Sequence, residues 1–172
     1  MSVRISTIFA AFCLLSPAAF AQDAPSDPHI AHIAYTAGVI DIEAAKLAVK
    51  MSKNEDVVAF AKDMLRDHEA VNNQALDLVA KLKVTPEDNA TSKSLTEAAA
   101  KERAELAKLD GAAFDKAYVE NEIAYHKQVN GALETLLIPS AQNAELKDLL
   151  ETGLKLFQGH QQHAEHVATM LK

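Results

Sequence analysis

The chain has 172 residues, with 17 Lys and Arg against 24 Asp and Glu, so its formal net charge is −7 at pH 7. An acidic chain without a basic footprint argues against nucleic acid as a partner and against adhesion to anionic membrane surfaces. With one cysteine, no tryptophan and only five residues each of glycine and proline, the composition is typical of an all-helical protein without disulfides.

The first 21 residues have the three parts of a secretory signal peptide. MSVR carries a positive charge, ISTIFAAFCLLS is apolar, and AFA precedes Gln22. The apolar run is too short for a membrane span, so we expect cleavage near Ala21, a periplasmic or secreted protein, and no stable membrane association afterwards. Cys13 lies in this segment, so a metal site in the remaining chain would use nitrogen and oxygen ligands.

Residues 22–27 read as a short polar leader, and residues 28–172 have the length of one domain. Asp27 followed by Pro28 is typical of a helix start. Apolar residues then recur every three or four positions, as on one face of a helix. They are Ile30, Ile33, Ala37, Ile40, Ala44, Leu47 and Met51.

A second helix is predicted after Ser52, because Ser52 and Glu55 have the spacing of a capping box. Its inward positions include one histidine and are Val57, Ala61, Met64, His68, Val71, Ala75, Leu78 and Leu82. Pro86 ends this pattern. Residues 87–110 are more polar and predict a shorter crossover helix that ends near Gly111.

The next two long helices carry polar residues at positions that should face the core. The first of them starts near Ala112, and its inward positions are Val119, Glu122, His126, Val129, Leu133 and Leu136. Residues 138–140 break the pattern, with Ser140 as the expected cap of the last helix. Two apolar stripes fit the last helix equally well, and His160 belongs to both. One is Leu146, Leu150, Gly153, Phe157, His160, Ala164, Val167 and Leu171, and the other is Leu149, Gly153, Leu156, His160, His163, Val167 and Met170.

Four long amphipathic helices predict an all-α four-helix bundle, with the shorter crossover helix between the second and third long helices. His68, His126 and His160 lie near the middle of their helices, and mid-helix positions fall at one level of a bundle. We therefore expect the three to converge. Glu122 lies one turn before His126 and can face the same point. The first helix offers Glu43, at the border of its apolar face.

Such a layer allows two interpretations. Neutral imidazoles and carboxylates are ligands for a divalent transition metal such as zinc, copper or iron. Alternatively, the helices could satisfy the same groups by hydrogen bonds, in a metal-free network that responds to pH because burial lowers histidine pKa values. A second, exposed metal patch would form if the two outer histidine pairs were adjacent. Those pairs are His29 with His32 and His163 with His166.

Three stretches resemble an exported bacterial family called domain of unknown function 4142, which is grouped with ferritin-like bundles. FAKDMLRDH (60–68) is similar to the family's Phe-Ala-x-x-Met-x-x-Asp-His. GAAFDKAYVENEIAYH (111–126) is similar to its Gly-x-x-Phe-Asp-x-x-Tyr with a following histidine, and LFQGHQQHAEHV (156–167) to its closing histidine helix.

This resemblance implies a ferritin-like fold and an envelope location. The positions that match the family's marked residues are Asp67, His68, Asp115, Tyr118, His126 and His160. Ferritin-like di-iron sites use Glu-x-x-His pairs, whereas Leu65 and Phe157 stand three residues before His68 and His160. A mononuclear or histidine-rich site is therefore expected in place of a di-iron centre.

The leading functional interpretation is a periplasmic bundle that binds a divalent transition metal in its core, in a binding or stress-protection role. The alternative is a metal-free interaction module with a buried histidine network. Hydrolytic or group-transfer activity is not expected, because no nucleophile motif is visible. A metal-dependent oxidoreductase is the third interpretation, behind the two non-enzymatic ones. A second copy of the chain or another envelope protein would be the partner.

Overall fold

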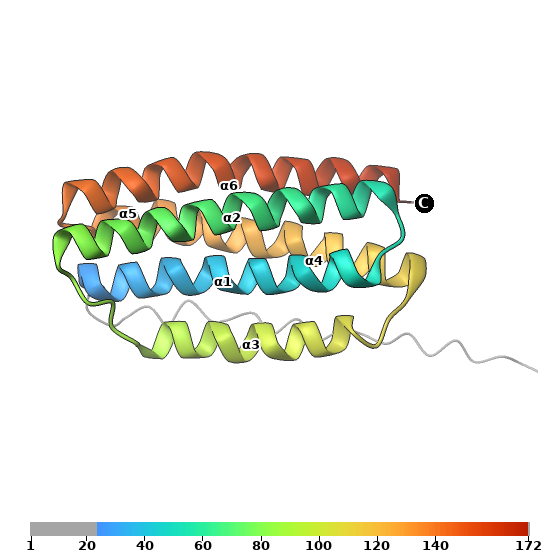
Figure 1. Ribbon diagram of the computed structural model, residues 1–172, viewed down its shortest axis with the longest axis horizontal. Coiled ribbons are helices and arrows are strands. Elements are labelled where there is room, and N and C mark those ends of the chain that lie inside the picture. The colour runs from blue at the N-terminus through green and yellow to red at the C-terminus, as the bar shows by residue number, and fades with distance from the viewer. Residues whose placement is uncertain (1–23, 172) are drawn as a thin grey trace, which may run out of the picture.

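The computed structural model describes residues 24–171, so the predicted signal peptide lies outside the described residues. The fold is all-helical, as predicted, and its four long helices form a bundle (Figure 1). They are α1 (Asp27–Met51), α2 (Glu55–Leu82), α4 (Gly111–Ala132) and α6 (Ala144–Met170). The predicted crossover helix is also confirmed as α3 (Ala90–Leu106), which packs on α1 outside the bundle. A specific likeness to ferritins stays a prediction.

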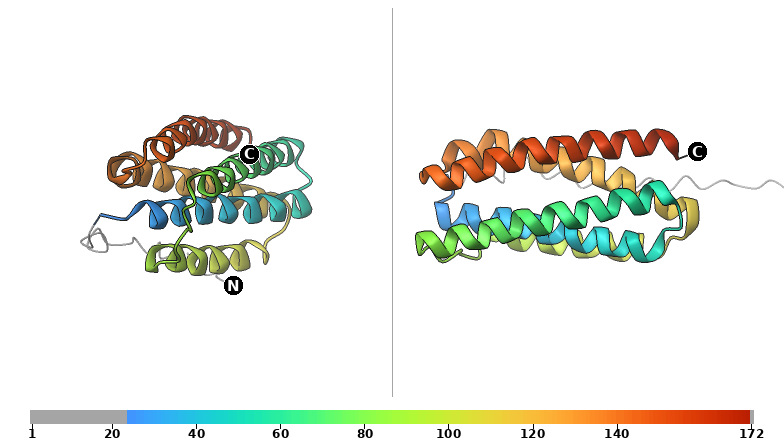
Figure 2. Two further views of the ribbon diagram at one scale, coloured as in Figure 1. Left: turned by 60° about the vertical axis from the view of Figure 1, so that its left-hand side comes forward. Right: turned by 45° about the horizontal axis from the view of Figure 1, so that its top comes forward.

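The helix directions follow from the connections. α1 and α6 run one way and α2 and α4 the other, and α3 returns the chain along the bundle between the parallel helices α2 and α4 (Figure 1). α1 packs most closely with α2, and α4 with α6. The bundle therefore consists of two helical pairs that face each other (Figure 2). Within the described residues, no helix is both long enough and apolar enough to cross a membrane.

Several helix ends differ from the prediction because a neighbouring polar residue competes for the cap. The predicted capping box of Ser52 and Glu55 is wrong. Asn54 caps α2 instead, since its Oδ1 accepts from the backbone N–H groups of Asp56 and Val57 at 3.0 and 3.3 Å. Likewise Asn143, and not Ser140, caps α6.

Asp27 begins α1 but is not its cap, which is Ser26. The Asp27 carboxylate accepts from the backbone N–H groups of Gln142 and Asn143 at 2.9 and 2.8 Å. The start of α1 is thereby tied to the start of α6. Gly111, expected to end the crossover helix, opens α4 with a φ of 49°, a left-handed conformation that glycine adopts without strain.

The chain does not break at residues 138–140. α4 instead continues through a π-helical turn, η2 (Leu133–Leu137), into a single helical turn, α5 (Ile138–Ser140). Leu133 and Leu137 are both buried in this segment. Because a π-turn inserts an extra residue, it changes which side chains after Ala132 face the bundle interior.

The core has two apolar clusters. One gathers Phe60, Met64, Phe114, Tyr118 and Val119 around the alanines of α1, and the other gathers Ile30, Leu133, Leu137, Leu150 and Phe157. On every long helix the sequence between the two clusters holds a buried ionisable residue. These ionisable residues form a polar layer, which has apolar side chains on both sides of it along the bundle.

At Gly38, α1 leaves no room for a side chain against Asn72 of α2. A Cβ atom added there would lie 2.3 Å from Oδ1 of the buried Asn72. The Asn72 amide Nδ2 donates to the backbone carbonyl of Tyr35 at 3.4 Å. The absence of a side chain at Gly38 thus makes room for an interhelical hydrogen bond.

We predict that Gly38→Ala lowers the free energy of unfolding by about 1 kcal/mol or more, because the Asn72 amide must leave its place. The matched control is Gly159→Ala in α6, where nothing lies within 4 Å of the added Cβ. This change should raise stability by about 0.5–1 kcal/mol through helix propensity alone. Urea unfolding of both variants checks the prediction, and a stabilising Gly38→Ala would contradict it.

Candidate functional site

Five ionisable side chains form the buried layer: Asp41 from α1, His68 from α2, Glu122 and His126 from α4, and His160 from α6. None is more than 5% exposed. The imidazole ring centres are 5.7 Å apart for His68 and His126, 5.2 Å for His68 and His160, and 5.4 Å for His126 and His160. The structure thus brings the three predicted histidines together, while their role as metal ligands stays a prediction.

Asp41 links two of these histidines. Its Oδ2 lies 3.5 Å from Nε2 of His68 and 3.5 Å from Nε2 of His126. Glu122 Oε2 lies 3.6 Å from Nδ1 of His126 on the other side of that ring. One donor atom from each of the three histidines lies within 4.8 Å of the others, and the same holds for Asp41, Glu122 and His126. His126 therefore belongs to two candidate metal-binding groups.

The prediction that Glu43 turns inward is wrong. Glu43 is exposed and pairs with Lys46 on the surface at 3.0 Å. The carboxylate of α1 in the layer is Asp41, which sequence reasoning missed. The inward face of α1 is lined by the small residues Ala44, Ala45 and Ala48, whereas Leu47, expected to be inward, is only partly buried. A stripe of alanines spaced by three and four residues from Asp41 was the signal that could have found it.

Hydrogen bonds orient two of the imidazoles. His126 Nδ1 lies 3.0 Å from the carbonyl oxygen of Glu122. Since a carbonyl can only accept, Nδ1 carries the proton, and the lone pair of Nε2 points to Asp41 and the layer. His160 Nε2 lies 3.1 Å from Oδ2 of Asp67. An ionised carboxylate likewise requires Nε2 to donate, which leaves the lone pair on Nδ1 of His160.

Asp67 is the outer support of this arrangement. It is near the surface, where Arg66 donates to both of its carboxylate oxygens at 2.7 and 3.0 Å. Although partial burial opposes ionisation, the hydrogen bonds from Arg66 and His160 hold the pKa of Asp67 below its usual range. An Asp67 carboxylate that is ionised at neutral pH keeps His160 in one orientation, as carboxylates do for metal-binding histidines.

Several donor and acceptor atoms of the layer have no hydrogen-bond partner in the described part of the chain. They are both oxygens of Asp41, both ring nitrogens of His68, Oε2 of Glu122, Nε2 of His126 and Nδ1 of His160. Buried polar atoms are nearly always paired, and each one left unpaired costs about 1–3 kcal/mol. The layer therefore concentrates, at one level of the bundle, polar atoms that the described residues leave without partners.

The other two residues singled out by the family resemblance, Tyr118 and Asp115, are buried on α4 before Glu122. Tyr118 is fully buried, and its hydroxyl also lacks a partner among the described residues. Asp115 is buried one turn before Tyr118, with Oδ1 unpaired. Burial, and next the charges of Glu122 and Asp41, raise the pKa of the Tyr118 hydroxyl, so it stays protonated and able to donate.

The second histidine patch does not form. His29 and His32 lie at the start of α1, and His163 and His166 near the end of α6. Because α1 and α6 run in the same direction, the two pairs stand at opposite ends of the bundle (Figure 1). His29 contacts Glu87 at 3.3 Å and His32 contacts the Ser92 hydroxyl at 3.0 Å, so both take part in holding α3.

Burial raises the pKa values of the acids in the layer and lowers those of the histidines. It raises the pKa of Asp41 to about 7, and it raises the pKa of Glu122 well above its usual range with help from the Asp41 charge. Burial also lowers the pKa of His126 to about 4 and that of His68 well below its usual range, and it lowers the pKa of His160. Neutral imidazoles and protonated carboxyls are thus favoured together in the metal-free protein.

These shifts predict how the stability of the metal-free protein depends on pH. Above about pH 6.5 the folded chain holds more protons than the unfolded chain, on Asp41 and Glu122, so stability falls as pH rises. Between about pH 6.5 and 4.5 the unfolded chain gains protons on three histidines that the folded chain resists. This outweighs the protons that Asp41 and Glu122 hold only in the folded chain, so stability falls as pH drops, although less steeply than the histidines alone would make it fall. We therefore expect a stability maximum near pH 6, measured as the free energy of unfolding in urea.

Glu122→Gln tests the contribution of the acids. Without the proton on Glu122, less opposes the effect of the histidines on the pH dependence of stability. The free energy of unfolding should then fall more steeply between pH 6 and 5 than in the unchanged protein, with a slope that is greater by up to about 1.4 kcal/mol per pH unit. Exposed Glu43→Gln is the control and should follow the unchanged protein. Identical pH profiles for Glu122→Gln and the unchanged protein would mean that Glu122 is ionised in the fold.

Comparisons with known proteins bear on the fold of this chain and on its family. A comparison with curated proteins finds no match. Among solved structures, the fold is similar to that of a DUF305 protein from Streptomyces coelicolor, described as secreted. The TM-score is 0.62 at 11% sequence identity, over 83% of this chain and 87% of the other. At that identity the similarity concerns the fold alone.

A family model covers most of the sequence. It spans residues 14–167 and therefore includes α1, α2 and α4 in full and α6 as far as Val167. It also includes all five residues of the buried layer, from Asp41 to His160. The chain belongs to the family described as domain of unknown function DUF4142.

Proposed function

We propose that the protein binds one divalent transition metal in the buried layer, with His68, His126, His160 and Asp41 as ligands. The observation that carries this proposal is the spacing around Asp41. Its Oδ2 lies 3.5 Å from two imidazole nitrogens, and no hydrogen bond joins them. Ligand atoms about 2.1 Å from a tetrahedral metal stand about 3.4 Å from one another. The gap is too long for a good hydrogen bond and suits two ligands of one ion.

The tautomers support the same conclusion. Hydrogen bonds to the Glu122 carbonyl and to Asp67 place the protons of His126 and His160 on the nitrogens that face away from the layer. Their free lone pairs are then directed inward. In a metal-free network some of these nitrogens would be expected to donate to one another or to Asp41, and the described residues contain no such bond.

The donor set favours zinc, copper or iron. Three neutral imidazoles and one carboxylate are borderline ligands that suit these ions better than calcium or magnesium, which prefer oxygen. Phe157 stacks on His68 with ring centres 4.7 Å apart, and apolar clusters lie on both sides of the layer. Such enclosure would slow exchange of the ion with solvent. It favours storage, sequestration or a structural role over rapid turnover.

Glu122 and Tyr118 would not bind the metal themselves but would support the ligand Asp41. Both are buried beside Asp41, and the high pKa values that burial gives them keep them protonated. A neutral Glu122 can donate to the Asp41 carboxylate, which would hold that ligand in place without adding negative charge. The metal itself would supply a positive charge that stabilises ionised Asp41.

We also propose that the protein acts outside the cytoplasm, in the periplasm or secreted. Three features support this: the signal-peptide pattern of residues 1–21, the family resemblance, and a similar fold in a protein described as secreted. A role in binding metal in the cell envelope, including protection against metal stress, fits that location. No residue of the layer is a thiol, so the ligands would tolerate an oxidising compartment.

Zinc titration of the metal-free protein tests the proposal. We expect one Zn²⁺ per chain and a rise in melting temperature with zinc concentration, because the ion binds only the folded state. His68→Ala should weaken zinc binding by about 100-fold or more, beyond the usual cost of losing an outer support. His166→Ala, which removes an exposed histidine, should bind zinc like the unchanged protein.

A second matched pair distinguishes the ligand from the residue that sequence reasoning chose. Asp41→Asn should weaken zinc binding strongly, whereas Glu43→Gln, two positions along α1, should leave it unchanged. If the unchanged protein binds no zinc, copper or iron at concentrations up to about 1 mM, where mass action should reveal even a weak site, the layer is a metal-free network. In that case His68→Ala would lower stability equally with and without metal.

A further inference from the structure

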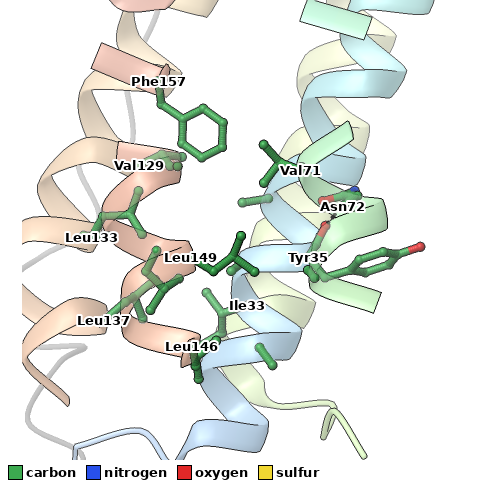
Figure 3. Close-up of a pocket in the computed structure, with 18 of the residues that line it drawn as sticks. Ile33, Tyr35, Val71, Asn72, Val129, Leu133, Leu137, Leu146, Leu149 and Phe157 are labelled. Atoms are coloured by element: carbon green, nitrogen blue, oxygen red, sulfur yellow. Dashed lines mark hydrogen bonds between the residues drawn. The ribbon is translucent and has the colours of Figure 1, made fainter. Parts of the chain in front are cut away.

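A cavity of about 90 Å³ lies in the half of the bundle that holds the apolar cluster of Leu133, Leu137 and Leu150. It is between the α1–α2 pair and the α4–α6 pair (Figure 3). Apolar side chains from both pairs face it, including Ile33, Val71, Val129, Leu133, Leu146 and Leu149. No charged side chain is among the described residues that line it. It is therefore distinct in chemistry from the polar layer.

The cavity exists because small residues stand at inward positions of all four long helices. Ala37, Ala75, Ala132 and Gly153 each line it, from α1, α2, α4 and α6 in turn. The π-turn at residues 133–137 places Leu133 and Leu137 on its wall. Several leucine and valine side chains here stay partly exposed although they occupy core positions, Val71, Leu78, Val129 and Leu149 among them.

Four polar side chains line the cavity: Tyr35, Asn72, Tyr125 and Gln128. Gln128 is exposed, and two of the others make hydrogen bonds to backbone carbonyls. The Tyr125 hydroxyl donates to the carbonyl of Ala37 at 2.8 Å, and the Asn72 amide donates to the carbonyl of Tyr35 at 3.4 Å. An ion or a strongly polar molecule would find no charged partner in this space. A water molecule needs two to four polar partners to be held in a cavity, which an apolar lining does not supply.

We propose that this cavity is a binding site for a small apolar molecule. An apolar cavity of about 150 Å³ in another protein stays dry and takes benzene or xenon. A space of about 90 Å³ is smaller, and it suits a ligand of xenon size or a diatomic gas such as dioxygen. The apolar walls, drawn from all four long helices, offer dispersion contacts, which is what binds such ligands.

Phe157 connects the cavity to the polar layer. Its ring lines the cavity and also stacks on His68, with ring centres 4.7 Å apart and planes 9° apart. A molecule in the cavity would therefore lie one aromatic ring away from a proposed metal ligand. Delivery of a small apolar molecule toward the metal would rest on the proposed function, whereas its binding in the cavity does not.

The test is methyl NMR of the metal-free protein under increasing xenon pressure. We expect saturable shifts of the Val71, Val129, Leu133 and Leu146 methyl groups. The methyl groups of Val57 and Val119, in the apolar cluster beyond the polar layer, should not respond. Unsaturable shifts, or shifts of equal size in both halves of the bundle, would overturn the proposal.

A pair of variants on α2 locates the ligand. Ala75→Leu fills the cavity and should weaken xenon binding by about tenfold or more, because the interior is too closely packed to make new room. Ala80→Leu adds the same side chain at an exposed position of the same helix and should leave binding unchanged. Equal binding by both variants would contradict the proposal. If Ala75→Leu does not fold, the titration of the unchanged protein still decides the result. Because no metal is added, failure of zinc binding would not affect this outcome.

Discussion

The structure depends on the burial of five ionisable side chains at one level of a small helical bundle. Asp41, His68, Glu122, His126 and His160 are almost without solvent contact, yet most of their polar atoms have no partner in the described chain. At about 1–3 kcal/mol for each unpaired group, such a layer would use up much of the stability of a domain of this size. Neutral imidazoles and protonated carboxyls reduce that cost, and a shared cation would remove more of it.

The bundle is organised around this layer. Each long helix contributes to it near its middle, and the two apolar clusters lie on either side. Outer groups hold the imidazoles in place, through the Glu122 carbonyl behind His126 and the Asp67–Arg66 pair behind His160. The tie between Asp27 and the start of α6 fixes the relation of the two helical pairs at one end. These contacts favour a preformed site over one assembled by the ligand.

Much of this could be predicted from the sequence, and the failures have physical causes. Apolar periodicity identified the long helices, and the position of His68, His126 and His160 within that periodicity indicated their convergence. Asp41 was missed because the pattern was weighted toward large side chains, whereas the inward face of α1 is built from alanines. The cap at Asn54 could not be chosen over Ser52 by spacing alone, since both are good caps. The π-turn after Ala132 has no sequence signal of comparable strength, because tertiary packing decides it.

The central claim is that His68, His126, His160 and Asp41 are ligands of one ion. X-ray absorption at the zinc edge of the zinc-loaded protein tests it most directly, because the scattering reports the atoms bound to the metal. The account predicts a shell of about four nitrogen and oxygen atoms at about 2.0–2.1 Å, with the outer scattering of three imidazoles, and loss of one imidazole in His160→Ala. A spectrum with mainly oxygen neighbours and at most one imidazole, unchanged in His160→Ala, would contradict the account.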